Sequence, residues 1–218
     1  MAKKKNISKQ DIVAFYMDYV LEHNANPKSV YAFSKHHNFE EAKFYEFFTT
    51  FEAVEKGIFE AFFENSLTVL EKSEDYQIFD ARNKLLSFYY TFFENLTANR
   101  SYVVYSLKRH KSGLKGLKTL SGLKKHFTKY IEKLGIQMLD IKQEQLEKIQ
   151  DRSLKETAWF QLLITMKFWL DDTSPAFEKT DIFIEKSVNT TFDVLDVAPL
   201  KSVIDLGKFL FKEKFQMN

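Results

Sequence analysis

The stretch that decides the fold is SVYAFSKHHNFEEAKFYEFFTTFEAV, residues 29–54. Apolar side chains recur in it every three or four residues, which is the spacing that places them on one face of a helix. We predict two short helices, near residues 29–37 and 40–48. Asn38 lies between them, and its short polar side chain tolerates the left-handed backbone of a tight turn. The stretch therefore predicts a helix, a tight turn and a second helix.

The sequence on either side of this stretch also follows helical spacing, and no segment alternates cleanly with period two. A first helix is predicted to begin at Ser8, with Asp11 in position to complete its cap. Thr49 is predicted to cap a long fourth helix that reaches about Leu70, with Glu52 as its capping partner. The inward stripe of the first helix is predicted to consist of Ile12, Phe15, Tyr16, Tyr19 and Val20.

In the remainder of the chain, the spacing of apolar residues predicts six more helices, which are separated by Gly, Pro and capping residues. Their expected ranges are 77–98, 102–110, 117–139, 154–170, 176–195 and 200–215. The predicted fold class is all-α. We expect residues 1–50 to form a small domain, a long helix at about 50–70 to follow it, and residues 71–218 to form a larger helical domain.

Composition and motifs limit the functions that this chain can have. It has no cysteine, which excludes disulfides, thiolate metal ligands and thiol catalysis. Motifs for phosphate loops, dinucleotide binding, zinc proteases and serine hydrolases are absent. The histidines are not spaced in the way that metal ligands on a helix are spaced. We therefore expect no enzyme, no metal and no cofactor. The amino terminus lacks the apolar segment of a signal peptide, and no apolar run has membrane-spanning length, so we expect a cytoplasmic protein.

The segment 29–54 resembles the DNA-binding segment of TetR-family transcriptional repressors. In that family a Ser or Thr opens the second helix and an apolar pair follows. A Gly-like turn residue, an apolar plug and an aromatic cluster ending in Phe come next. These roles fall here, in order, to Ser29, Val30 with Phe33, Asn38, Phe39 and residues 44–48. The segment FWLDDTSPAFEKTDIFIEKSV, residues 168–188, resembles the last two helices of the carboxy-terminal domain in the same family.

The resemblance implies a three-helix helix-turn-helix domain and a larger bundle that binds a ligand. It implies a homodimer formed through the helices at about 154–170 and 176–195. A symmetric dimer would place two helix-turn-helix units on palindromic double-stranded operator DNA. A small-molecule effector would then change their spacing.

On this reading an amino-terminal arm and the second and third helices contact DNA. The expected DNA-binding residues are Lys3, Lys4, Lys5, Ser29, Lys35, Lys43, Tyr45 and Glu46. The third helix nevertheless carries Glu40, Glu41 and Glu46, and carboxylates in its first turn compete with phosphate for the helix amino terminus. One glutamate can accept a hydrogen bond from cytosine N4. The sequence leaves open whether this helix contacts DNA or only packs in the domain core.

Aromatic residues concentrate in the predicted larger domain, and most of them must be buried in its core. A subset can line an apolar pocket between helices. The expected pocket residues are Tyr89, Phe93, Tyr105, Phe127, Trp159, Phe160, Met166 and Trp169. Their side chains suit an apolar or aromatic effector.

Two features support an alternative function. Residues 100–133 contain ten Lys or Arg and one acid, Glu132, and residues 200–215 form an amphipathic pattern rich in lysine. Basic surfaces and amphipathic helices both bind anionic membranes. The alternative is a protein of the same fold that has lost DNA binding and holds a lipid-like ligand, with a membrane surface as its partner.

Overall fold

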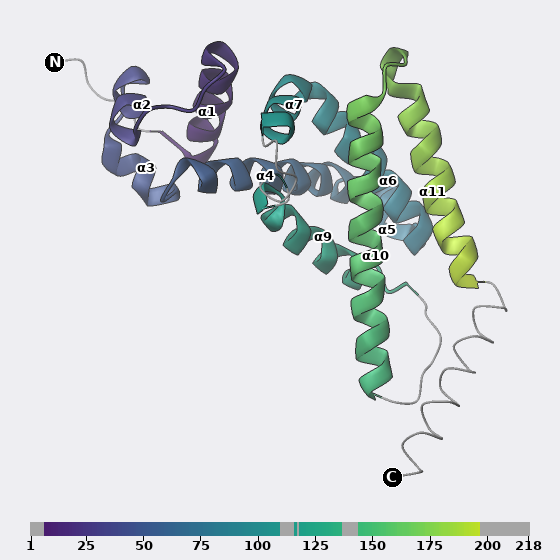
Figure 1. Cartoon of the computed structure of the whole chain (residues 1–218). Helices are drawn as coiled ribbons and strands as arrows, with labels where there is room; N and C mark the ends of the chain where they lie inside the picture. The colour runs from purple at the N-terminus through teal and green to yellow at the C-terminus, as the bar shows by residue number, and fades with distance from the viewer. Residues whose placement is uncertain (1–6, 110–115, 117, 137–143, 197–218) are drawn as a thin grey trace, which may run out of the picture. The chain divides into compact units, whose positions relative to one another are not determined.

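The computed structural model describes residues 7–109, 116, 118–136 and 144–196 (Figure 1). Every regular element in these ranges is a helix, so the predicted all-α fold class is confirmed. The elements are α1 (Lys9–His23), α2 (Val30–His36), α3 (Glu41–Phe47), α4 (Phe51–Glu71), α5 (Glu74–Ile78), α6 (Ala81–Ala98), α7 (Arg100–Arg109), α9 (Ser121–Lys133), α10 (Glu144–Asp171), the short 3-10 helix η1 (Pro175–Phe177) and α11 (Glu178–Asp196). The predicted helix at 200–215 and the arm lysines lie outside the described residues.

The described residues form two compact units. Unit 1 takes its residues from 1–72 and 91–127, and unit 2 takes its residues from 73–90 and 128–218. The helices α1 to α4 and α7 belong to unit 1, whereas α5, α10 and α11 belong to unit 2. The division of function between residues 1–50 and 71–218 stays a prediction.

The first helix begins as predicted. Ser8 Oγ accepts a hydrogen bond from Asp11 N at 3.2 Å, and the Asp11 carboxylate accepts one from Ser8 N at 2.7 Å. The helix ends at Asn24, whose φ of 47° turns the chain away from the helix axis. Along the predicted stripe, Ile12, Tyr16 and Val20 are fully buried, and Phe15 and Tyr19 are half-buried.

The predicted turn is confirmed in detail. Ser29 Oγ caps α2 by accepting a hydrogen bond from Ala32 N at 3.1 Å. Asn38 has a φ of 57°, the left-handed conformation that its short side chain permits. The turn closes where Phe39 N donates to Ser34 O at 3.0 Å. Local capping and turn chemistry thus fixes the angle between α2 and α3.

The predicted cap of α4 is wrong by one residue. Thr50, not Thr49, precedes the helix, and its Oγ1 accepts a hydrogen bond from Ala53 N at 3.2 Å. A cap must reach the amide three residues on. With Thr50 as the cap, that amide belongs to Ala53, so Glu52 does not occupy the capping-box position.

The predicted helix at 77–98 is also wrong, because two helices cover this region. α5 ends at Ile78, and α6 begins at Ala81. Asp80 lies in the break, where its Oδ1 accepts a hydrogen bond from Asn83 N at 2.8 Å. The carboxylate satisfies an amide that an uninterrupted helix would have bonded to its own backbone.

Two other helices differ in length from their predictions. α9 begins at Ser121 and ends at Lys133, because Gly135 takes a φ of +60° and terminates the helix. α10 begins ten residues before the predicted start at 154. Its first turns are rich in Glu, Gln and Lys, which form helices readily without an apolar stripe.

In unit 2, α10 and α11 lie side by side and antiparallel (Figure 1). The turn between them contains two residues other than glycine with left-handed backbone, Ala176 at a φ of 52° and Phe177 at 60°. Asp172 holds this turn together. Its carboxylate accepts hydrogen bonds from both the backbone amide and the hydroxyl of Ser174 and of Thr180, at 2.7–2.9 Å.

Candidate nucleic-acid interface

An aromatic core holds the helix-turn-helix together. Phe33 lies at its centre and is fully buried. Its ring centroid lies between 5.5 and 6.5 Å from those of four neighbours in edge-on contact, Tyr16, Phe39, Phe44 and Phe51. Because these rings come from α1, the turn, α3 and α4, one side chain on α2 fixes the orientation of the three-helix unit.

A buried hydrogen-bond network ties α1 to α4. Tyr16 Oη donates to Glu55 Oε1 at 2.6 Å and lies 3.0 Å from Asn26 Oδ1. Glu55 is only 3% exposed. Glu55 is not among the residues predicted from the sequence, although a glutamate between the apolar Val54 and Ile58 of one helix is a signal that could have found it. The network links the helix-turn-helix to the amino-terminal half of α4.

The middle of α4 is tied to α6 within unit 1. Asn95 Nδ2 donates to Phe62 O at 3.1 Å. Asn99 Nδ2 donates in turn to Asn95 O at 2.9 Å. A cavity of about 430 Å³ lies beside these amides, lined by α1, α4 and α6. None of the residues predicted to line the effector pocket contributes to it.

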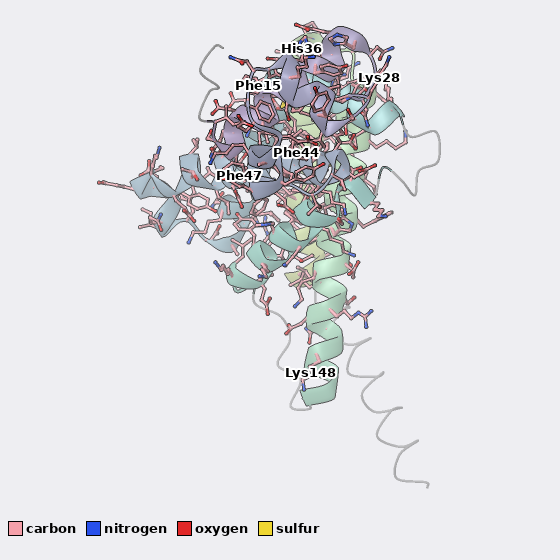
Figure 2. All side chains as sticks on the ribbon, turned by 90° about the vertical axis from the view of Figure 1, so that its left-hand side faces the viewer. Phe15, Lys28, His36, Phe44, Phe47 and Lys148 are labelled. Carbon is pink, nitrogen blue, oxygen red and sulfur yellow. The ribbon has the colours of Figure 1, made fainter. Side chains whose placement is uncertain are left out.

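The outer face of α2 carries polar and aromatic side chains. Ser29, Lys35 and His36 are exposed, and Tyr31 is 62% exposed. Lys28, just before the helix, is also exposed. Figure 2 looks onto the helix-turn-helix and labels Lys28 and His36 at its surface. Two of the predicted DNA-binding residues, Ser29 and Lys35, are therefore accessible.

The outer face of α3 is formed by residues on the side opposite the buried Phe44. Tyr45 is 53% exposed, and its ring lies edge-on against Phe44 with centroids 5.6 Å apart. Phe47 is 38% exposed and lies at the surface of the helix (Figure 2). Tyr45 and Glu46 are exposed on this helix and Lys43 is half-buried, and their role as DNA contacts stays a prediction.

An ion pair neutralises the single lysine of α3. Lys43 Nζ lies 2.7 Å from Glu46 Oε2, one turn along the helix, and both side chains are accessible to solvent. Exposed pairs of this kind contribute little to stability, on the order of 0.5 kcal/mol. The pair matters more for recognition, because it occupies the cation that phosphate would otherwise attract.

The residues predicted to line an effector pocket divide between the two units. Phe93, Tyr105 and Phe127 belong to unit 1, and the other five belong to unit 2. Seven of the eight are buried or half-buried, whereas Phe160 is 62% exposed on α10. Burial raises the pKa of the Tyr89 hydroxyl, so this side chain stays neutral at physiological pH. Their role as ligand contacts stays a prediction.

An apolar strip follows the exposed side of α10 and α11. Phe160, Ile164 and Phe168 recur every four residues on α10, and Ile182 is 49% exposed on α11. The rings of Phe168 and Phe183 stack across the two helices with centroids 4.6 Å apart and an interplanar angle of 8°. This strip coincides with the helix pair predicted to form the dimer.

These features define a class of protein, in which a helix-turn-helix precedes an all-α body. The sequence model for the domain described as "Tetracyclin repressor-like, C-terminal domain" matches residues 84–210, more than half of the chain. The chain therefore belongs to the TetR family, and the resemblance seen in its amino-terminal sequence is confirmed at family level. No curated protein matches the sequence.

Membrane-spanning helices and metal-binding clusters are both absent from the described residues. Among residues 7–109, 116, 118–136 and 144–196, no helix has the length and hydropathy needed to cross a membrane. Over the same part of the chain, no cluster of His, Asp and Glu is arranged to hold a metal ion.

Proposed function

We propose that this TetR-family regulator is a ligand-responsive homodimer that binds operator DNA through α2 and α3 in the cytoplasm. The observation that carries the proposal is the α2–turn–α3 geometry. The turn buries Phe33, Phe39 and Phe44, and it leaves the opposite face of α3 accessible along its length. A helix presented in this way can enter the major groove of DNA, where base edges are read.

Phosphate contacts are proposed to come from residues outside α3. Lys28 and Lys35 are exposed beside α2, and Ser29 caps that helix. The arm residues Lys3, Lys4 and Lys5, which lie outside the described residues, add three positive charges. Since Lys43 is paired with Glu46, we expect most of the salt-dependent affinity to come from α2 and the arm.

The dimer is proposed to form through α10 and α11. A strip containing Phe160, Ile164, Phe168 and Ile182 is too apolar to favour contact with water. Covering it with the same strip of a second copy gives a two-fold symmetric contact. Such symmetry would present two copies of α3 to a palindromic operator.

The effector is proposed to be an apolar or aromatic small molecule. The support is the aromatic and apolar character of the buried residues of unit 2, including Tyr89, Trp159, Met166 and Trp169. A ligand held among such side chains would change the free-energy difference between DNA-binding and non-binding arrangements of the dimer.

DNA binding is tested by measuring the affinity of the full chain for random-sequence duplex DNA over a range of salt concentrations. We expect weak binding that falls steeply with salt, because each phosphate contact releases counterions. The slope of the logarithm of the binding constant against the logarithm of the salt concentration should become smaller in magnitude by about 1 in Lys35→Ala, because one phosphate contact is lost. Lys148→Ala, which removes an exposed lysine from α10, serves as the control and should leave the slope unchanged.

The alternative function gives the opposite result in the same experiment. A chain that has lost DNA binding should show no affinity for duplex DNA even at low salt. It should instead adsorb to vesicles that contain anionic lipid, and removal of residues 198–218 should abolish that adsorption. This combination of results would overturn the proposal of DNA binding.

A further inference from the structure

The outward face of α3 offers base edges an unusual set of chemical groups. The helix reads EAKFYEF and contains no Arg, Asn or Gln. Those three side chains make the bidentate hydrogen bonds by which proteins commonly select guanine and adenine. Lysine can also select guanine, but the ammonium of Lys43 gives one of its three hydrogens to Glu46 at 2.7 Å and lies beside that carboxylate. On this helix, the side chains that make bidentate bonds to purines are therefore missing, and the one lysine is shared with Glu46.

What the outward face of α3 presents is apolar surface, the hydroxyl of Tyr45 and the carboxylate of Glu46, whose Oε2 is paired with Lys43. Ala42 and Glu46 are four residues apart and share the face opposite the buried Phe44. Tyr45 flanks this face, 53% exposed. Its ring lies edge-on against that of Phe44, with centroids 5.6 Å apart. A methyl group, an aromatic ring and a carboxylate are thus displayed together.

Pyrimidines carry the groups in the major groove that match these side chains. Thymine has a C5 methyl group, which is the apolar group on the edge of a base pair, and cytosine has an N4 amino group that donates hydrogen bonds. An ionised carboxylate accepts hydrogen bonds and donates none. It is therefore repelled by the acceptor-rich edge of guanine.

We infer that α3 recognises pyrimidines: Ala42 and Tyr45 contact thymine methyl groups, and Glu46 accepts a hydrogen bond from cytosine N4. The inference rests on the proposed function, because it assumes that α3 enters the major groove. It adds the base chemistry of the site to that proposal. It also gives the acidic character of α3 a purpose, since Glu46 selects a base while α2 and the arm supply the attraction to phosphate.

The thymine part is tested with modified DNA. The full chain is first used to select tight-binding duplexes from a random library. Each enriched thymine is then replaced by deoxyuracil, which removes only the methyl group. Loss of one buried methyl should weaken binding about four-fold at the contacted positions. In Tyr45→Ala the same replacement should have a smaller effect, whereas in Tyr90→Ala, which removes a 38% exposed ring from α6, the effect should persist.

The cytosine part is tested by repeating the selection with Glu46→Gln. Glutamine makes a bidentate pair with adenine, so the variant should prefer adenine at one position where the natural chain prefers cytosine. The ratio of its affinities for the adenine and cytosine sites should rise about ten-fold or more. Glu22→Gln makes the same charge change on α1 and should leave the selected sequence unchanged.

The possible results separate this inference from the proposed function. If no duplex binds at low salt, the proposed function is overturned, and the inference with it. If duplexes bind but deoxyuracil has no effect and Glu46→Gln selects the same bases as the natural chain, only the pyrimidine inference is overturned.

Discussion

Glu55 shows how strongly a single buried charge depends on its partner. Its carboxylate is almost completely removed from water and accepts a 2.6 Å hydrogen bond from Tyr16. A buried charged group without partners would be strongly destabilising. The short bond therefore indicates that burial and pairing occur together when α1 packs against α4.

We predict that Tyr16→Phe lowers the free energy of unfolding by about 1.5–3 kcal/mol, because the buried Glu55 carboxylate loses a donor. Urea-induced unfolding followed by circular dichroism measures the change. Thr68→Val is a matched control, since it also removes a hydroxyl hydrogen bond, but an exposed one on α4. Equal losses in the two variants would contradict the importance of the buried network.

Asp172 provides a pH-dependent prediction. Burial acts to raise the pKa of its carboxyl, but hydrogen bonds from Ser174 and Thr180 outweigh burial and lower the pKa from 3.8 to about 2. Because the folded pKa lies below the unfolded value, the stabilisation is complete above about pH 4 and is lost as the pH falls towards 2.

We therefore expect Asp172→Asn to be less stable than the natural chain at pH 6, with the difference shrinking as the pH is lowered towards 2. Denaturant unfolding at several pH values between 6 and 2 gives this difference directly. Asp193→Asn, which alters an exposed carboxylate of α11, separates the effect from a general loss of negative charge. A stability difference that is independent of pH would show that the four hydrogen bonds to the ionised carboxylate are not the source of the stabilisation.

Among the elements, α4 offers a direct test of helix capping. Thr50→Ala should lower the free energy of unfolding by about 1 kcal/mol, because the amide of Ala53 loses its acceptor. Thr49→Ala, one residue earlier, should change it by less than about 0.5 kcal/mol. Thermal and urea unfolding of the two variants together decide which threonine begins the helix.

Elements whose ends depend on local chemistry were predicted well from the sequence. Ser8, Ser29 and Asn38 each act through atoms within five residues, so their roles are visible in the sequence itself. The break at Asp80 was missed, since apolar spacing continues across it and only the capping bond to Asn83 reveals it. The early start of α10 was missed for the converse reason, because its first turns have no apolar stripe.

The candidate site was predictable only in part. Exposure of Ser29, Lys35, Tyr45 and Glu46 follows from their places on short amphipathic helices. The pairing of Lys43 with Glu46 was not foreseen, although i,i+3 spacing permits it. Glu55 could not be assigned a partner, because Tyr16 lies 39 residues away in the sequence. Contacts at such separations depend on tertiary packing, which residue spacing alone does not give.

At the scale of the whole molecule, we predict that Ile164→Glu converts the proposed dimer to monomer. A carboxylate in the middle of the α10–α11 strip would lose its hydration on association without gaining a partner. Sedimentation velocity at micromolar concentration measures the mass. Ile78→Glu, at an 83% exposed position on α5, should leave the mass unchanged.

If the natural chain sediments as a monomer at every concentration tested, the dimer proposal fails regardless of the variants. If Ile164→Glu stays dimeric, the chain associates through another surface. In the expected case, the monomeric variant should also lose most of its affinity for a palindromic operator, because the two half-sites then bind independently.

The attachment of α4 at two points has a mechanical consequence. Its amino-terminal half is bonded to α1 through Glu55 and Tyr16, and its middle is bonded to α6 through Phe62 and Asn95. Phe62 lies 11 residues, about 17 Å, from the first residue of α4, so a tilt of about 5° about Phe62 moves that end of the helix by about 1.5 Å. A displacement of that size exceeds the tolerance of a hydrogen bond. The helix can therefore convert a small rearrangement near Asn95 into the making or breaking of individual contacts at its amino-terminal end.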